Sequence, residues 1–231
     1  MKFSKGQAPK DQPRKGPQDR CPSPNTEYRI SPSIDEDAMT ESELDPNPQN
    51  EQTLLEGLHW ESGDAEIRIS YSNINQLIDL ELFMSTSRSL PNASLTLCDR
   101  FDGKIGIVDL VGNHSGVPIH SQNYGTLLVN LAIQTIHFFY GLDTTSPEKH
   151  QVRIFGRISH NDAPTQEPGR TRDINMRINF WQRFGFRVDN PESIGPKIWA
   201  TLDQLSQLDR GVTPAGIPTT LCLSNFSLIK P

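Results

Sequence analysis

The stretch of sequence that decides the fold lies between residues 105 and 141. It reads IGIVDLV at 105–111 and GTLLVNLAIQTIHFFYG at 125–141. The first part is an almost continuous apolar run, which is typical of a central strand covered on both faces. The second part places apolar residues at helical spacing around most of its girth, so it predicts a well-buried helix. Gly141 is expected to end this helix as its C′ residue.

The segments on either side of this stretch predict a sheet of mixed strand directions. Alternating apolar and polar residues indicate strands, and Ser72 and Asn73 are expected to join the first two as a hairpin. We expect an α/β (α+β) fold: a mixed, twisted β-sheet flanked by helices, antiparallel at its start and locally parallel where 105–111 meets 151–159. The expected strands are 65–71, 77–84, 93–98, 105–111, 151–159, 186–188, 197–202 and 219–229, and a second helix is expected at 173–184.

The first 50 residues differ in composition from the rest of the chain. They hold eight of the eighteen prolines and no Trp. Residues 1–30 carry seven Lys and Arg against three Asp and Glu, whereas residues 31–66 carry eleven acidic residues and no Lys or Arg. Such a segment buries too little apolar surface to offset the entropy cost of ordering. We therefore predict a disordered, Pro-rich charged tail at 1–50 and a domain at 51–231. The tail is either a solvated linker or an arm that serves a protein partner or export.

Composition and charge exclude several classes of protein. The longest apolar runs fall far short of the ~18 residues of a membrane-spanning helix, and the N-terminus lacks the apolar core of a Sec signal peptide. Three cysteines are too few and too scattered for a disulfide framework, which favours a reducing, cytoplasmic location. The net charge of −6 argues against general nucleic-acid binding. His114 and His120 have no third ligand nearby, so no metal site is expected.

Two short stretches resemble the GNAT superfamily of N-acetyltransferases. In that superfamily a central strand leads into Arg/Gln-x-x-Gly-x-Gly/Ala, which opens a helix, and a later helix ends in a phrase such as Phe-Tyr-x-Lys-Leu-Gly-Phe. Here the corresponding segments are HSQNYGTLL at 120–128 and FWQRFGF at 180–186. Gly125 stands at the second glycine position, Asn123 at the first, and His120 at the Arg or Gln position.

The resemblance implies a GNAT-like domain that binds acetyl-CoA as a cosubstrate. The pyrophosphate would meet the start of the helix, where free N–H groups attract anions. The pantetheine arm would pair with the edge of 108–111, where two strands splay. The binding residues implied in this way are Val108, Leu110, Val111, His120, Asn123, Gly125, Thr126, Leu127, Arg177 and Trp181.

Acetyl transfer requires a base for the amine proton, and the candidates are Asp109, His160 and Asp162. Asp109 lies within an otherwise apolar strand, where burial would raise its affinity for a proton. A carboxylate on this strand serves as base in some members of the superfamily, but Asp109 can equally be a hydrogen-bonded structural acid. His160 and Asp162 follow the strand at 151–159, near the expected mouth of the site, and can equally be ordinary loop residues. The superfamily often has an acidic tyrosine where this chain has Trp181, whose indole N–H can only donate a hydrogen bond.

The sequence therefore leaves two functions open. One is an acetyl-CoA-dependent N-acetyltransferase that acts on an amine of a small molecule or a protein. The other is a catalytically inactive GNAT-fold interaction or regulatory protein, of which a bacterial effector is one form; Trp181, Asn123 and His120 motivate it. The acceptor is set by loops such as 112–123 and 160–172, for which a fold gives no guide.

Overall fold

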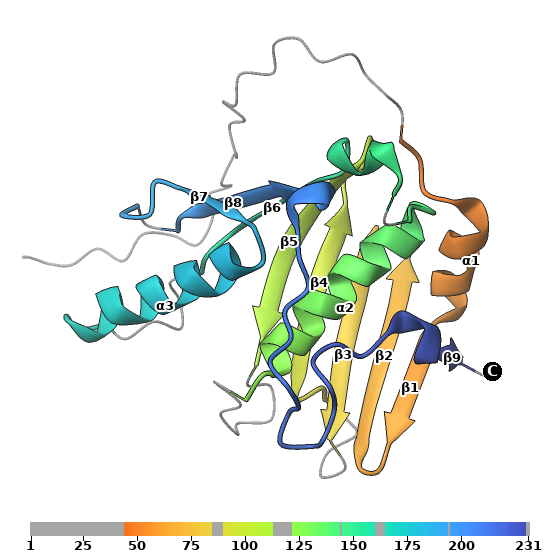
Figure 1. Ribbon diagram of the computed structural model, residues 1–231, viewed down its shortest axis with the longest axis horizontal. Helices are drawn as coiled ribbons and strands as arrows, with labels where there is room; N and C mark the ends of the chain where they lie inside the picture. The colour runs from red at the N-terminus through yellow and green to blue at the C-terminus, as the bar shows by residue number, and fades with distance from the viewer. Residues whose placement is uncertain are drawn as a thin grey trace, which may run out of the picture. The chain divides into compact units, whose positions relative to one another are not determined.

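The computed structural model describes residues 44–84, 90–112, 122–143, 145–159, 165–193 and 195–229, all within the compact unit Thr40–Pro231. These residues form one nine-stranded sheet and three α-helices (Figure 1). None of these helices has the length and apolarity that a bilayer-spanning segment needs. In chain order the elements are α1 (Pro48–Glu56), β1 (Leu58–Ser62), β2 (Ala65–Ser72), β3 (Leu77–Met84), β4 (Ala93–Asp99), β5 (Lys104–Val111), α2 (Tyr124–Phe139), η1 (Pro147–His150), β6 (Arg153–Arg157), α3 (Gly169–Arg183), β7 (Arg187–Asp189), β8 (Lys197–Thr201), η2 (Leu202–Gln204), η3 (Leu223–Asn225) and β9 (Ser227–Leu228).

The strand order confirms the predicted mixed sheet. It runs β7-β8-β6-β5-β4-β3-β2-β1-β9. From β1 to β5 each strand pairs antiparallel with the next strand of the chain. The pairing of β5 with β6 is parallel, as predicted, whereas β8 pairs antiparallel with both β6 and β7. A parallel pair needs a crossover connection, and the segment that contains α2 provides it.

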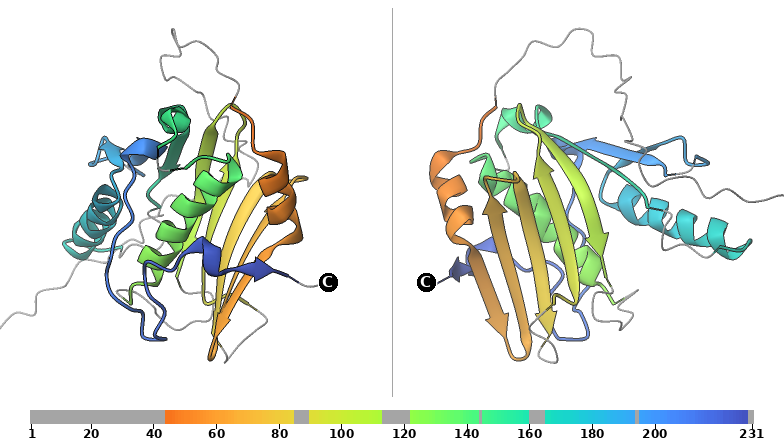
Figure 2. Two further views of the ribbon diagram at one scale, coloured as in Figure 1. Left: turned by 45° about the vertical axis from the view of Figure 1, so that its right-hand side comes forward. Right: turned by 180° about the vertical axis from the view of Figure 1, so that it is seen from behind.

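The helix α2 forms the centre of the core. It lies across one face of the antiparallel strands (Figures 1 and 2), and seen from behind these strands stand in front of it. Twelve of its 16 residues are buried, which agrees with the apolar girth of its sequence. On its other side the chain between residues 205 and 226, here called the C-terminal strap, crosses the helix. The helix is therefore covered from both sides.

The last strand and the second helix differ most from the expected elements; the strand expected at 151–159 is shorter, Arg153–Arg157, and α1 and β1 were not expected. The last strand, expected at 219–229, is wrong in extent: only Ser227–Leu228 pairs with β1. The residues before it belong to the strap, where the side chain of Gln134 bonds Leu221 O (2.9 Å) and Leu223 N (2.8 Å) in place of a strand partner. The second helix begins at Gly169, four residues before the expected start. The sequence did not indicate this first turn because it is polar and carries no apolar periodicity.

The helix α1 and the residues before it contact the end of α2. The N–H of Asn47 donates to Phe139 O at 2.8 Å, and its side-chain oxygen caps α1 by accepting from the N–H groups of Gln49 and Asn50. The side-chain amide of Asn50 donates to Phe138 O at 2.6 Å. A boundary between residues 50 and 51 stays a prediction, but a cut there would remove these bonds.

We predict that the chain starting at Leu44 keeps the melting temperature of the full chain within about 2 °C. The chain starting at Glu51 should melt about 5 °C lower or more, because a lost cap and two lost hydrogen bonds amount to roughly 2 kcal/mol. Differential scanning calorimetry on the three chains measures both differences. A lower melting temperature for the chain starting at Leu44 would show that residues 1–43 stabilise the domain.

A buried carboxylate joins β4 to the end of α2. Asp99 is 1% exposed. Its Oδ1 accepts from the N–H of Phe101 at 3.0 Å and from the hydroxyl of Tyr140 at 3.4 Å. Burial raises the pKa of Asp99 above its ordinary value, and these two hydrogen bonds offset only part of that rise. The folded state therefore binds a proton at Asp99 more readily than the unfolded state.

It follows that Asp99 stabilises the fold at low pH and that this contribution is lost as pH rises through its raised folded-state pKa. The Asp99→Asn variant keeps an acceptor oxygen but cannot ionise. We expect the free energy of unfolding of this variant to increase, relative to that of the parent chain, as pH rises from 4 to 7. Urea unfolding at several pH values measures this difference, and a difference that does not change with pH would contradict the assignment.

Candidate functional site

The parallel strands β5 and β6 separate soon after they pair. Their register includes only Lys104–Gly106 opposite Arg153–Phe155. Beyond it, β5 continues to Val111 paired with β4, and β6 continues to Arg157 paired with β8. Within the described part of the chain, the edge of β5 from Val108 to Val111 thus has no strand partner on the β6 side. The sheet has an opening at this place.

Two local features accompany the opening. A β-bulge shifts the register of β5 against β4, so that Val108 has no partner residue and is 57% exposed. A bulge bends its strand and increases the twist, which turns β5 away from β6. At the last point of close approach β6 has a glycine: a Cβ on Gly156 would lie 3.0 Å from the Cβ of Ile107. The two strands can therefore meet there before they diverge.

The helix α2 starts beside this opening. Its N-cap, Asn123, has φ of 63° and makes no capping bond to the helix. Its side-chain amide instead donates to Arg210 O at 3.1 Å and to Val212 O at 3.4 Å in the strap. No described side chain caps the first turn, so its N–H groups and the positive end of the helix dipole can bind an anion.

The glycine of the first turn packs against α3. A Cβ on Gly125 would lie 3.5 Å from Cζ of Phe180 and 4.0 Å from Cδ2 of Leu110, which is ordinary contact. Phe180 thereby connects the start of α2 with α3. The sequence motifs do not single out Phe180 as a site residue; its place as the first aromatic of 180–186 is the signal that could have found it.

Trp181 and Arg177 are held in place by α3 and its neighbours. Trp181 is 7% exposed and meets the rings of Phe180 and Phe186 edge-on, with centroids 5.3 and 5.2 Å away. The guanidinium of Arg177 pairs with Asp173 (2.8 Å) and donates to Ser159 O (2.9 Å) just beyond β6. Arg177 therefore ties α3 to the strand end at the opening.

The burial expected for Asp109 is wrong, because its side chain is exposed. It lies opposite Thr96 on the sheet face away from α2. At Asp109, β5 pairs with β4 on one edge, and its other edge borders the opening. Solvent therefore reaches Asp109 directly. His120, His160 and Asp162 lie outside the described residues. Among the other expected site residues, Leu110 and Gly125 meet at Phe180, while the side chains of Thr126 and Leu127 point into the core.

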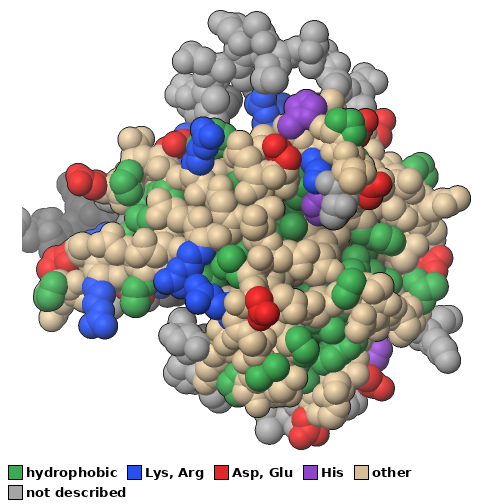
Figure 3. Space-filling view, viewed as in Figure 1, with side chains coloured by type: hydrophobic (Ala, Val, Ile, Leu, Met, Phe, Trp, Pro, Cys, Tyr) green, Lys and Arg blue, Asp and Glu red, His purple; other side chains and the backbone are tan. Residues whose placement is uncertain are grey.

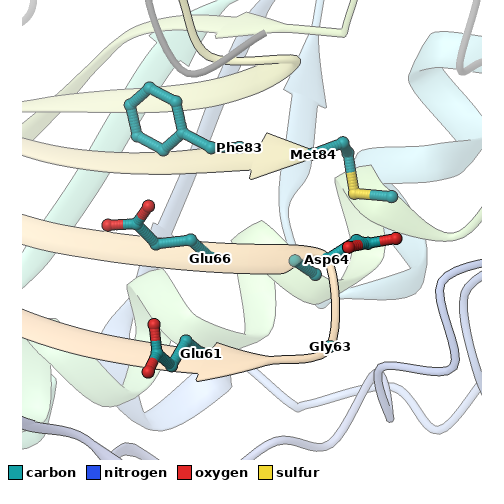
Figure 4. A pocket seen from close by; sticks show the side chains of 7 residues that line it. Glu61, Gly63, Asp64, Glu66, Phe83 and Met84 are labelled. Atoms are coloured by element: carbon teal, nitrogen blue, oxygen red, sulfur yellow. The ribbon is translucent and has the colours of Figure 1, made fainter. Parts of the chain in front are cut away.

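Two hollows formed by described residues lie elsewhere. A cavity of about 10 Å³ at the β1–β2 hairpin is lined by Glu61, Glu66 and Phe83 among others (Figure 4), and it has room for one water at most. A shallow hollow of about 560 Å³ lies where β1 meets β9, beside His59 and Asn225. Neither holds the residues of the β5–β6 opening.

Comparisons with solved structures give similarities to acetyltransferases. An acetyltransferase of the GNAT family from Staphylococcus aureus Mu50 is 9% identical; the match covers 56% of this chain and 70% of that one, with a TM-score of 0.38. A protein from Bacillus anthracis described as a streptothricin acetyltransferase, solved with acetyl coenzyme A, is 12% identical over 59% of this chain and 81% of that one, with a TM-score of 0.33. No protein-family model matches the sequence, and no curated protein matches it significantly.

Proposed function

We propose that the chain is an acetyl-CoA-dependent N-acetyltransferase that acts on an amine of a small molecule or a protein. The observation that carries the proposal is the opening between β5 and β6 next to the start of α2. It offers an unpaired strand edge and an uncapped helix N-terminus side by side, and the edge of Val108–Val111 lies on the side of β5 from which β6 has diverged.

The shape of acetyl-CoA fits this pair of features. The pantetheine arm is an extended chain with two amide groups, which can bond a free strand edge as an added strand does. The pyrophosphate is an anion suited to a helix N-terminus. The N–H of Leu127 already donates to Asn123 O at 3.0 Å, so Gly125 and Thr126 are the donors that we assign to the phosphates.

The reaction joins the acceptor nitrogen to the acetyl carbon and breaks the carbon–sulfur bond. The amine gives up a proton and the departing sulfur gains one. We assign the first proton to Asp109, because it lies on the part of β5 that borders the opening and its exposed carboxylate can pass the proton to solvent. We assign no acid to Trp181, because an indole N–H cannot supply the second proton.

A second function rests on one observation. Trp181 fills its place in the core with two aromatic partners, and a tyrosine hydroxyl is the usual acid at this position of the superfamily. A domain that keeps the fold but has packed this position with an indole can serve as an interaction or regulatory protein. This alternative predicts a stable fold without turnover.

Calorimetric titration of acetyl-CoA into the full chain tests the assigned binding site. We expect micromolar affinity for the parent chain. Gly125→Val should weaken binding at least tenfold, about 1.4 kcal/mol, because its branched side chain displaces Phe180 and the helix start. Gly125→Ala is the matched control: its Cβ makes only ordinary contacts, so it should bind more tightly than the valine variant. Silence of the parent chain at millimolar acetyl-CoA would overturn the proposal.

Substitution of Trp181 separates the two functions. If departure of the thiolate limits turnover, Trp181→Tyr should hold or raise the rate with a panel of amines, because a phenol can donate the proton. Trp181→Ala should instead lose about 3–5 kcal/mol of stability through the cavity it leaves. Absence of turnover in both the parent chain and the tyrosine variant would exclude the transferase and leave the interaction or regulatory protein as the remaining function. Loss of turnover in a folded Trp181→Phe variant that still binds acetyl-CoA would show that the indole N–H takes part in catalysis.

A further inference from the structure

The three strands β6, β8 and β7 present one face away from α3. The register places Phe155 opposite Trp199 and Trp199 opposite Arg187, so these three residues form one row across the strands. The residues between them along each strand, such as Ile154 and Ile198, are buried in the core on the other face. The row therefore belongs to the outer face of this half of the sheet.

The aromatic rings of this row are available to a ligand. Phe155 is 39% exposed, and Trp199 is half-buried. The guanidinium of Arg187 lies 4.9 Å from the centroid of the Trp199 ring, as in a cation–π contact. On the β5 side the row ends at Gly106, where the Arg100 side chain and the edge of the Phe155 ring both approach the glycine.

Cationic side chains surround this row. The register positions of the face hold five of them, and the side chain of Arg100 reaches the same face beside Gly106. The only carboxylate at these described positions is Asp189. In the view of Figure 3, Lys and Arg side chains are visible near the upper margin, with Asp and Glu side chains between them. The cations are Arg100, Lys104, Arg153, Arg157, Arg187 and Lys197, and all are exposed.

We propose that this aromatic–cationic face binds single-stranded nucleic acid. Bases stack on exposed aromatic rings of a sheet, and Lys and Arg around the rings neutralise the phosphates. One base can stack on the exposed Phe155 ring, and its neighbour can stack on the planar guanidinium of Arg187, which lies over the Trp199 ring. The net charge of −6 argues against general nucleic-acid binding only if the charges are spread evenly over the surface. They are not, because cations outnumber carboxylates on this face.

An acidic peptide is the competing ligand, and the rings favour a nucleic acid over it. A peptide carboxylate would use the cations alone and would leave the row of Phe155 and Trp199 without a role. The proposal does not rest on acetyl transfer, because the face lies outside the β5–β6 opening and involves none of the residues assigned to it.

Tryptophan emission and anisotropy of a labelled 12-residue oligothymidylate test the proposal in the full chain. The oligonucleotide should quench the emission of the parent chain. The quench should persist in Trp60→Phe, whose indole lies on β1 at the far side of the sheet, and should disappear in Trp199→Phe. The Phe155→Ser variant should bind about fivefold more weakly or worse, the low end of the loss for one stacked base.

A pair of double variants tests the phosphate contacts. Arg187→Gln with Lys197→Gln should reduce the salt dependence of log Kd by about 1.4, from two lost phosphate contacts. Arg172→Gln with Arg183→Gln removes two exposed cations of α3 instead and should leave that slope unchanged. Melting temperatures of all variants confirm that they are folded.

Two results would overturn the proposal. One is equal quenching in Trp199→Phe and the parent chain, which would remove the stacking site. The other is binding of polyglutamate as tight as that of the oligonucleotide with no change in emission, which would indicate a surface for acidic proteins. Titration without acetyl-CoA keeps both results independent of the transferase proposal.

Discussion

The fold depends on one buried amide, the side chain of Asn130. It is 0% exposed in the middle of α2. Its nitrogen donates to Leu208 O at 2.8 Å and Thr219 O at 2.7 Å, and its oxygen accepts from Leu208 N at 2.9 Å. A helix that is apolar around most of its girth must be covered both on the side that faces the sheet and on the opposite side. Here the irregular C-terminal strap covers the opposite side. Backbone groups of such a strap need partners when buried, and Asn130 supplies three of them from within the helix.

The same arrangement positions the candidate site. Asn123 holds the strap at the start of α2, as Asn130 and Gln134 do further along. The helix start is thereby fixed beside the opening of β5 and β6. The side chain of the N-cap residue Asn123 donates to the strap and makes no hydrogen bond to the first turn of the helix. An uncapped helix end next to an unpaired strand edge is the physical basis of the proposed acetyl-CoA site.

Charge is distributed unevenly over the sheet face that bears no helix. The half formed by β2–β5 presents Asp79, Thr96 and Asp109 in one row, with Thr96 donating to Asp79 at 2.7 Å. The half formed by β6–β8 presents the aromatic–cationic face. A net charge computed over the whole chain averages these two regions, so it predicts the behaviour of neither. Only the register of the strands brings the cations of distant segments together.

The sequence by itself determined the elements whose signal is local. The helix expected at 125–140 is observed at Tyr124–Phe139, the strand expected at 77–84 has these bounds, and the parallel contact of the fourth and fifth expected strands is present. Only the tertiary structure decided which groups meet. Asn130 bonds a residue 78 positions away, the bulge at Val108 needs β4 as its partner, and Asp109 is exposed because it lies on the sheet face that bears no helix. The physical reason is that helix and strand preferences depend on neighbours in the chain, whereas burial and hydrogen-bond partners depend on segments that only folding brings together.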